Sequence, residues 1–288
     1  MKNLAISLVL LGSLVSHADS NVVLSDGKVN YELAGETGHP LVVLVHGVSG
    51  PMMVWDKTVE ALNEAGFQTL RYDLYGRGGS DRINSTYGLD LYLRQLSDLL
   101  DVLKIHQPIT LVGSSMGAII STAFTLAHPD KVTKLVLIGP GGFPLSTPPT
   151  SKLLNNPTVD PMVIQMIAER VILEQNRNYF YEPENFTDYL EKFKVQLAVK
   201  GSIDAILQTT RNVPLQDFID EYEKLNKRQQ QVLILWGKED VSFPYSYHSV
   251  LTEALPRADF IAIPRAAHLP QYEQADMVNL SLIQFLNR

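Results

Sequence analysis

Short apolar runs alternate with longer amphipathic segments along most of this chain, and this alternation is its strongest constraint on the fold. Several runs are nearly continuous in Val, Ile and Leu, as is typical of strands buried on both faces of a parallel sheet. We expect strands at residues 29–33, 41–45, 68–72, 109–112, 134–138, 232–235 and 260–263. The pattern predicts an α/β fold with a mostly parallel central sheet, flanked by helices and joined by right-handed crossovers.

The segments between these runs have helical periodicity. In the longest of them, apolar residues stand at positions 89, 93, 96, 99, 100 and 103, which is the i, i+3, i+4, i+7 spacing of one helix face. We expect each of these helices to cover the sheet with its apolar side. The expected helices are at residues 55–65, 89–104, 116–127, 247–254 and 275–286.

The alternation breaks once, after the strand at 134–138, and no convincing strand follows until the one at 232–235. The intervening segment begins with several prolines and glycines and continues with helix-like pieces at 161–174, 185–199 and 202–209. Roughly ninety residues is too long for a simple connection within a compact domain. We therefore predict an α/β core in two parts, residues 19–140 and 231–288, with a helical cap inserted at residues 141–230.

The N-terminal sequence MKNLAISLVLLGSLVSHADS has the pattern of a secretory signal. Lys2 supplies a positive charge, residues 4–15 are apolar, and Ser16 and Ala18 are small residues suited to a signal-peptidase site. The apolar stretch is shorter than the ~20 residues of a membrane-spanning helix. We predict a signal peptide at residues 1–18, a periplasmic or secreted protein, and no integral membrane segment after cleavage. A short membrane anchor or a buried first helix is the alternative.

Composition excludes several classes of site and partner. The chain has no cysteine, which excludes disulfides, thiolate metal sites and a cysteine nucleophile. The formal net charge is −7 and there is no Lys/Arg run, so we expect no nucleic-acid partner. With 288 residues, 45% of them hydrophobic, the chain is long enough for a large domain with a sizeable core.

The sequence Gly113-Ser114-Ser115-Met116-Gly117 matches the pattern G-x-S-x-G where a predicted strand ends and a helix begins. In that context the pattern indicates a nucleophile elbow, a tight turn that exposes its middle residue in a strained conformation. The frame set by the two glycines selects Ser115 as the nucleophile and leaves Ser114 as its neighbour. An ordinary polar turn is the alternative.

A serine nucleophile needs a base, and the base needs an orienting acid. Among the seven histidines, His268 is the candidate base, because it follows the last predicted strand in the short loop RAAHLP. Asp240, in the loop after the strand at 232–235, is the candidate acid, and its neighbour Glu239 competes for that role. The predicted triad is therefore Ser115, Asp240 and His268, with a structural loop histidine as the alternative for His268.

The strand at 41–45 ends in His46-Gly47, which leaves the backbone N–H of Val48 available beside the elbow. With the N–H of Met116 at the start of the following helix, it can form an oxyanion hole. The polarity of the helix N-terminus adds to the Met116 donor. We expect His46 to hold this loop in place and not to transfer protons. The alternative is that His46-Gly47 forms a simple turn with no role in an oxyanion hole.

Taken together, these motifs resemble the α/β-hydrolase superfamily over nearly the whole mature chain, residues 21–288. The segments that carry the resemblance stand in the family's order: HGVSG, RYDLYGRGGSD, GSSMG, WGKED and AAHLP. The resemblance implies that family's fold and a serine triad that needs no metal and no organic cofactor. It also implies mainly structural roles for Asp73, Gly76, Gly78 and Ser80 in the second segment.

The identity of the elbow residue limits the classes of reaction that the chain can catalyse. Haloalkane dehalogenases and epoxide hydrolases of this family have Asp there, so Ser115 favours an acyl-enzyme. Hydrolases that cleave carbon–carbon bonds of aromatic ring-cleavage products usually have Asn before the nucleophile and Trp after the histidine, where this chain has Ser114 and Leu269. The form GxSMG is similar to monoacylglycerol lipases, lysophospholipases and general carboxylesterases.

We therefore expect an exported serine hydrolase that acts on carboxylic esters, with a small-molecule ester or a lipid as its substrate. Trp55, near the oxyanion loop, and Phe143, after two glycines, are candidate walls of the substrate pocket. Carbon–carbon bond, amide, thioester or haloperoxidase-like chemistry on the same triad is the alternative. A non-catalytic binding protein with this fold is the alternative of another class.

Overall fold

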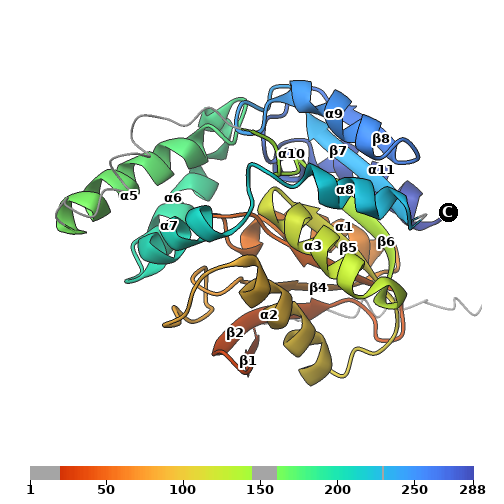
Figure 1. Cartoon of the computed structure of the whole chain (residues 1–288), viewed down its shortest axis with the longest axis horizontal. Helices are drawn as coiled ribbons and strands as arrows, with labels where there is room; N and C mark the ends of the chain where they lie inside the picture. Colours follow the sequence, from red (N-terminus) through yellow and green to blue (C-terminus); the bar gives the residue numbers. More distant parts are fainter. Residues whose placement is uncertain (1–19, 145–160, 229) are drawn as a thin grey trace, which may run out of the picture.

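The computed structural model describes residues 20–144, 161–228 and 230–288, and an eight-stranded sheet lies at its centre (Figure 1). Across the sheet the strands stand in the order β1-β2-β4-β3-β5-β6-β7-β8. Their bounds are β1 Ser20–Val23, β2 Lys28–Ala34, β3 Leu41–Val45, β4 Gln68–Tyr72, β5 Ile109–Ser114, β6 Val132–Ile138, β7 Gln231–Gly237 and β8 Asp259–Ile263.

Most neighbouring strands in this sheet are parallel. β2 is antiparallel to both of its neighbours, β1 and β4, and every other pair is parallel. The predicted mostly parallel α/β sheet is therefore confirmed, and each of the seven predicted strands is present. The prediction missed β1, because four residues are too few to show a strand periodicity.

Helices cover both faces of the sheet. One layer holds α2 Leu89–Val102, α3 Met116–Ala127, α8 Ile219–Asn226 and α9 His248–Ala254, which contact one another in that order. The other layer holds α1 Asp56–Glu64, α10 Pro270–Glu273 and α11 Ala275–Leu286. A short helical turn, η1 Met52–Trp55, precedes α1.

The two hydrophobic cores explain why the central strand β3 is apolar at every residue. In β3, Val43 and Val45 pack in the core under α2 and α3, whereas Val42 and Leu44 pack in the core under α1 and α11. Successive side chains of a strand point to opposite faces, so a strand covered by helices on both sides has no polar face.

The cap helices lie to one side of the sheet (Figure 1). They are α5 Pro161–Arg177, α6 Thr187–Leu197 and α7 Ser202–Asn212, with the turn η3 Pro183–Phe186, and they contact one another. α8 also falls within the range predicted as cap, residues 141–230, but it packs against α3 and α9 of the core. The helices that stand away from the sheet are therefore α5 to α7, and part of the predicted range, residues 145–160 and 229, lies outside the described residues.

The predicted signal peptide, residues 1–18, also lies outside the described residues. Within the part of the chain that the structure describes, no helix combines the length and the apolar character needed to cross a membrane. In the same residues no group of three or more His, Asp or Glu side chains could hold a metal ion.

Candidate active site

The predicted site residues follow the carboxyl ends of neighbouring parallel strands. β3 ends at Val45, β5 at Ser114, β7 at Gly237 and β8 at Ile263. Because these strands run in the same direction, their following loops meet at one edge of the sheet, which is where open α/β sheets bind ligands. The structure thus brings together the segments that contain His46, Ser115, Asp240 and His268.

Ser115 occupies a sharp turn between β5 and α3. Its φ and ψ angles are 58° and −120°, a left-handed conformation that is costly for a residue with a side chain. The two flanking glycines allow this turn: a Cβ on Gly117 would lie 2.1 Å from the Val45 carbonyl oxygen, and one on Gly113 would lie 2.2 Å from the Gly117 carbonyl oxygen. The local geometry is that of a nucleophile elbow with Ser115 at its centre.

Asp240 and His268 form a buried pair. Asp240 Oδ2 lies 2.8 Å from His268 Nδ1, and both side chains are almost fully shielded from solvent. The other carboxylate oxygen, Oδ1, accepts the N–H groups of Ser242 and Phe243 at 2.8 and 3.0 Å, which fixes the orientation of the carboxylate. Glu239, the competing acid, instead accepts the backbone N–H of Ala266 at 3.1 Å and holds the histidine loop.

Ser115 and His268 line the same small cavity, into which a substrate carbonyl would have to fit. The cavity measures about 10 Å³, roughly the space that one water centre needs. No hydrogen bond joins the Ser115 side chain to His268 among the described contacts; catalytic hydrogen bonds are often long without substrate. The cavity is lined by Gly47, Val48, Ser49, Gly50, Val54, Ser114, Ser115, Tyr179, Tyr189, His268 and Leu269.

The predicted oxyanion-hole donors lie beside Ser115. A Cβ on Gly47 would lie 3.0 Å from Ser115 Cβ, so the loop approaches the elbow as closely as a glycine allows. Met116 is the first residue of α3, whose N–H has no intrahelical acceptor. Among the described residues no acceptor is recorded for the N–H of Val48. Two backbone donors are thus available next to the nucleophile.

His46 holds the oxyanion loop, in agreement with its predicted role. The Leu74 N–H donates to His46 Nε2 at 2.9 Å, so Nδ1 carries the proton and donates to the Gly47 carbonyl oxygen at 2.8 Å. Burial lowers the pKa of His46 to about 4, which keeps the ring neutral and preserves both bonds. The held carbonyl belongs to the same peptide plane as the Val48 N–H, so His46 fixes the direction of that donor.

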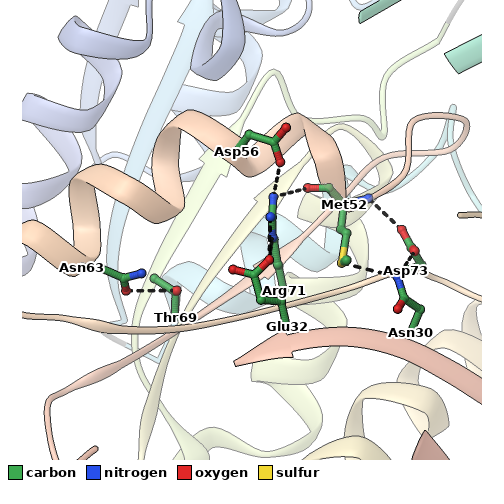
Figure 2. Close-up of polar contacts among 8 residues, drawn as sticks. All are labelled: Asn30, Glu32, Met52, Asp56, Asn63, Thr69, Arg71 and Asp73. Atoms are coloured by element: carbon green, nitrogen blue, oxygen red, sulfur yellow. Dashed lines mark hydrogen bonds and ion pairs between the residues drawn. The ribbon is translucent and has the colours of Figure 1, made fainter. Parts of the chain in front are cut away.

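A buried polar network holds the far end of the same loop (Figure 2). Asp73 Oδ1 accepts the Met52 N–H at 2.8 Å, and Oδ2 accepts the Asn30 side-chain amide and the Gly79 N–H. Arg71 donates to the Met52 carbonyl oxygen at 3.2 Å, so Met52 is held at both its N–H and its carbonyl group.

Arg71 completes this network by pairing with two carboxylates. Its guanidinium contacts Glu32 on β2 at 2.6 Å and also pairs with Asp56 at the start of α1 (Figure 2). The resemblance implied a structural role for Asp73, Gly78 and Ser80. Their contacts agree, because Ser80 donates to the Asp73 carbonyl oxygen and a Cβ on Gly78 would collide with the Asp73 carboxylate.

The two candidate pocket walls lie in the hydrophobic cores. Phe143 stacks on Tyr222 and Tyr247 and contacts Trp236, and Trp55 is fully buried in the core under α1 and α11. Neither residue is among those that line the cavity at Ser115. Their contact with substrate therefore remains a prediction without a supporting contact.

The cap contributes residues that no sequence motif indicated. Tyr179, just after α5, places its ring 4.8 Å from the His268 ring, and its carbonyl oxygen accepts the N–H groups of His268 and Leu269. Tyr189 of α6 lines the cavity, and its buried hydroxyl has no partner among the described residues. These tyrosines cover the nucleophile, whereas a larger groove of about 480 Å³ between α5 and α6 lies away from the triad.

Glu273 was also missed, although it links the histidine loop to the cap. Its carboxylate accepts the Ala267 N–H and the Tyr181 N–H, each at 2.7 Å. Burial raises the pKa of Glu273 to about 7, an effect that the two donated hydrogen bonds oppose. Its position, five residues after His268, carries no distinguishing pattern in a single sequence.

Comparison with known proteins agrees with this geometry. A family model described as alpha/beta hydrolase fold matches residues 40–275. A 2-hydroxy-6-oxononadienedioate/2-hydroxy-6-oxononatrienedioate hydrolase of Burkholderia vietnamiensis is 30% identical over 280 residues, which cover 92% of this chain and 94% of that protein.

Solved structures with the same fold include proteins of different activity. An esterase from Exiguobacterium antarcticum superposes with a TM-score of 0.78 at 20% identity, covering 94% of this chain and all of that one. A meta-cleavage product hydrolase from Pseudomonas fluorescens superposes with a TM-score of 0.73 at 22% identity, covering 93% and 97%. At these identities the likeness concerns the fold, which confirms the predicted fold class.

Proposed function

Because the chain belongs to the α/β-hydrolase fold family, we propose that it is a serine hydrolase that cleaves carboxylic esters through an acyl-enzyme on Ser115. The observation that carries the proposal is the convergence of three groups at one cavity. They are the elbow serine, the Asp240–His268 pair with its 2.8 Å contact, and two backbone N–H donors without another acceptor.

In the proposed reaction, Ser115 Oγ attacks the ester carbonyl while His268 Nε2 takes the serine proton. The oxyanion of the tetrahedral intermediate accepts the N–H groups of Val48 and Met116. Collapse expels the alcohol, which receives the proton from His268, and a water activated by the same ring then releases the acid. Asp240 holds the Nδ1–H and stabilises the imidazolium.

The lining of the cavity supports an ester in preference to the substrates named for the sequence relatives. Those names describe dioates, which carry two carboxylates. None of the eleven residues that line the cavity at Ser115 is Lys or Arg. Ser114 and Leu269 also stand where carbon–carbon bond hydrolases usually have Asn and Trp. A neutral ester suits this lining better than a dianion, because a buried charge needs a partner.

Cleavage of a carbon–carbon bond is the second candidate. It is supported by the 30% identity to a dienedioate hydrolase over nearly the full length of both chains. The same serine, histidine and donors would serve it. Amide and thioester hydrolysis would also use these groups and differ only in the leaving group.

A substrate panel tests these proposals. The full chain would be assayed on p-nitrophenyl esters from acetate to laurate, on a p-nitroanilide, on an acyl thioester and on 2-hydroxy-6-oxononadienedioate. We expect the highest kcat/KM on an ester. A higher value on the dienedioate would overturn the ester proposal in favour of the second candidate.

Ser115→Ala tests the nucleophile, with Ser114→Ala as the matched control on the adjacent hydroxyl. We expect Ser115→Ala to lower kcat by a factor on the order of 10⁵–10⁶, since only binding and oxyanion stabilisation remain. Ser114→Ala should keep much of the activity. Labelling by a fluorophosphonate probe distinguishes an enzyme from a non-catalytic binding protein, and undiminished turnover by Ser115→Ala would exclude the mechanism.

We also propose that the protein is exported after cleavage near residue 18. β1 begins at Ser20 and pairs along its whole length with β2, so cleavage there leaves the sheet intact. Expression of the full gene product in a bacterium with a functional secretion pathway, followed by N-terminal sequencing, should give a mature chain beginning near Asp19. A cytoplasmic protein that retains Met1 or Lys2 would contradict the proposal.

A further inference from the structure

Arg77 is a buried cation whose hydrogen bonds all go to neutral oxygen atoms. The side chain is part of the RYDLYGRGGSD segment and only 2% exposed. Nε donates to the Val48 carbonyl oxygen at 2.7 Å, and Nη1 donates to the Tyr75 carbonyl oxygen and the Tyr92 hydroxyl at 2.8 and 2.6 Å. Nη2 donates to the Thr209 hydroxyl at 2.7 Å. No ion pair with a described carboxylate accompanies these bonds.

A buried guanidinium without a carboxylate partner is unfavourable for stability, because its desolvation is not offset by a paired charge. Such a residue therefore calls for a reason other than stability. The residue that accepts its shortest hydrogen bond to the backbone supplies such a reason. Val48 is the residue whose N–H is proposed to bind the oxyanion, and Arg77 binds the carbonyl group of the same residue.

The peptide planes on both sides of Val48 are held by side chains. His46 donates to the Gly47 carbonyl oxygen, which fixes the plane that contains the Val48 N–H. Arg77 fixes the following plane through the Val48 carbonyl oxygen. A rotation of the Gly47–Val48 peptide that turned the Val48 N–H away from Ser115 would break the His46 bond, and a displacement of Val48 as a whole would break the Arg77 bond.

We propose that Arg77 is a positioning residue for the oxyanion hole: its guanidinium fork holds the Val48 carbonyl and thereby keeps Val48 in the place from which its N–H, oriented through the His46 bond, reaches the substrate oxygen. This inference rests on the proposed function, since it assigns Arg77 a role in the same reaction. The planar fork suits the task, because its N–H groups point in fixed directions toward Val48, Tyr75, Tyr92 and Thr209 at once.

Arg82 provides a matched control for the competing explanation that Arg77 only anchors the cap. Both arginines belong to the same segment, and both reach α7, Arg77 through Thr209 and Arg82 through Ser202. Arg82 otherwise donates to the carbonyl oxygens of its own loop and has no recorded contact with the oxyanion loop. A loss of activity specific to Arg77 therefore reports on Val48 and not on cap anchoring.

The test compares Arg77→Met, Arg77→Lys and Arg82→Met in the full chain, with circular dichroism as a check of folding. For Arg77→Met we expect kcat on p-nitrophenyl acetate to fall about 10- to 100-fold with KM changed less than about threefold. This is smaller than the ~10²–10³-fold loss on removal of a hole donor itself. The affinity for butylboronic acid, which forms a tetrahedral adduct with an activated serine, should fall in parallel. Arg82→Met should keep kcat within about twofold of the wild type.

Arg77→Lys keeps the charge but loses the fork, so it decides the question if Arg77→Met does not fold. We expect its kcat to fall at least about fivefold, because one ammonium group cannot hold oxygen atoms in several fixed directions. A folded Arg77 variant with wild-type kcat, a change confined to KM, or an equal loss in Arg82→Met would overturn the inference. Full activity in Ser115→Ala would instead overturn the proposed function, so the two failures are distinguishable.

Discussion

The oxyanion loop, residues 46–51, and the histidine loop, residues 264–269, meet at Ser115 but are held by different parts of the molecule. The oxyanion loop is bound mainly by the core segment after β4, through the Leu74 N–H, Arg77 and the bond of Asp73 to the adjoining Met52, and by one bond from the cap, Asn176 Nδ2 to Ser49 Oγ at 2.9 Å. The histidine loop is bound by the core segment after β7, through Glu239 and Asp240, and also by the cap, where the Tyr179 carbonyl oxygen accepts the His268 and Leu269 N–H groups. The two halves of the site therefore depend on different contacts.

This difference matters because the cavity at Ser115 has room for little more than a water. Tyr179 and Tyr189, which come from the cap, form part of its lining, so a displacement of the cap would enlarge it. A displacement of the cap backbone at Asn176 and Tyr179 would break one hydrogen bond to the oxyanion loop and two to the histidine loop, and the bonds between the oxyanion loop and the core would remain. The Glu273 carboxylate keeps its hydrogen bond from the Ala267 N–H whether or not the bond from the Tyr181 N–H is broken.

The largest expected effect concerns the core anchor of the oxyanion loop. Asp73→Ala removes an acceptor from two buried donors, on Met52 and Asn30, and from the more exposed N–H of Gly79, and we expect the free energy of unfolding to fall by about 3–5 kcal/mol. Asp56→Asn, at the more exposed end of the Arg71 network, should cost less than about 1 kcal/mol. Urea unfolding of both variants measures the difference, and similar losses would contradict the distinction between a buried and a peripheral anchor.

The sequence was sufficient to predict the parts of this arrangement that depend on local spacing. Seven of the eight strands follow from their apolar runs, and the elbow turn at Ser115 and the positions of Asp240 and His268 follow from motifs within a few residues of a strand end. The pairing of Asp240 with His268 follows in turn, because parallel strands bring their carboxyl ends together.

The cap contacts could not be predicted in the same way. Arg77 meets Thr209 across 132 residues of sequence, and Tyr189 reaches the cavity only because α6 folds back over the core. Nothing local to these residues fixes that geometry. Trp55 and Phe143 show the converse, because their proximity to motifs in sequence placed them near the pocket, whereas packing placed their rings in the cores.

The contributions of His46 and Glu273, one at each loop, to the free energy of unfolding should also change with pH in opposite directions. The pKa of His46 is lowered to about 4 by burial, so the unfolded chain binds a proton more readily than the folded chain. Its contribution to stability is present above about pH 6.5 and is lost as the pH falls toward 4. Replacing it by His46→Gln, which has one donor and one acceptor but does not titrate, should flatten this acid-side loss by about 2 kcal/mol. Urea unfolding between pH 4 and 7 tests this, and an unchanged slope would refute it.

Glu273 should give the smaller effect of opposite sign. Its folded-state pKa is raised to about 7, mainly by burial, so the folded chain binds the proton more readily. Its contribution to stability is therefore greatest below about pH 4.5 and is lost as the pH rises to 7. Relative to the wild type, Glu273→Gln should lack this decline, which we expect to be on the order of 1–2 kcal/mol.

Because the pH ranges of the His46 and Glu273 effects overlap, the stability of the wild type can vary little with pH, while the stabilities of the two variants change with pH in opposite directions. Parallel profiles for the two variants would contradict the opposite pH dependences expected for His46 and Glu273.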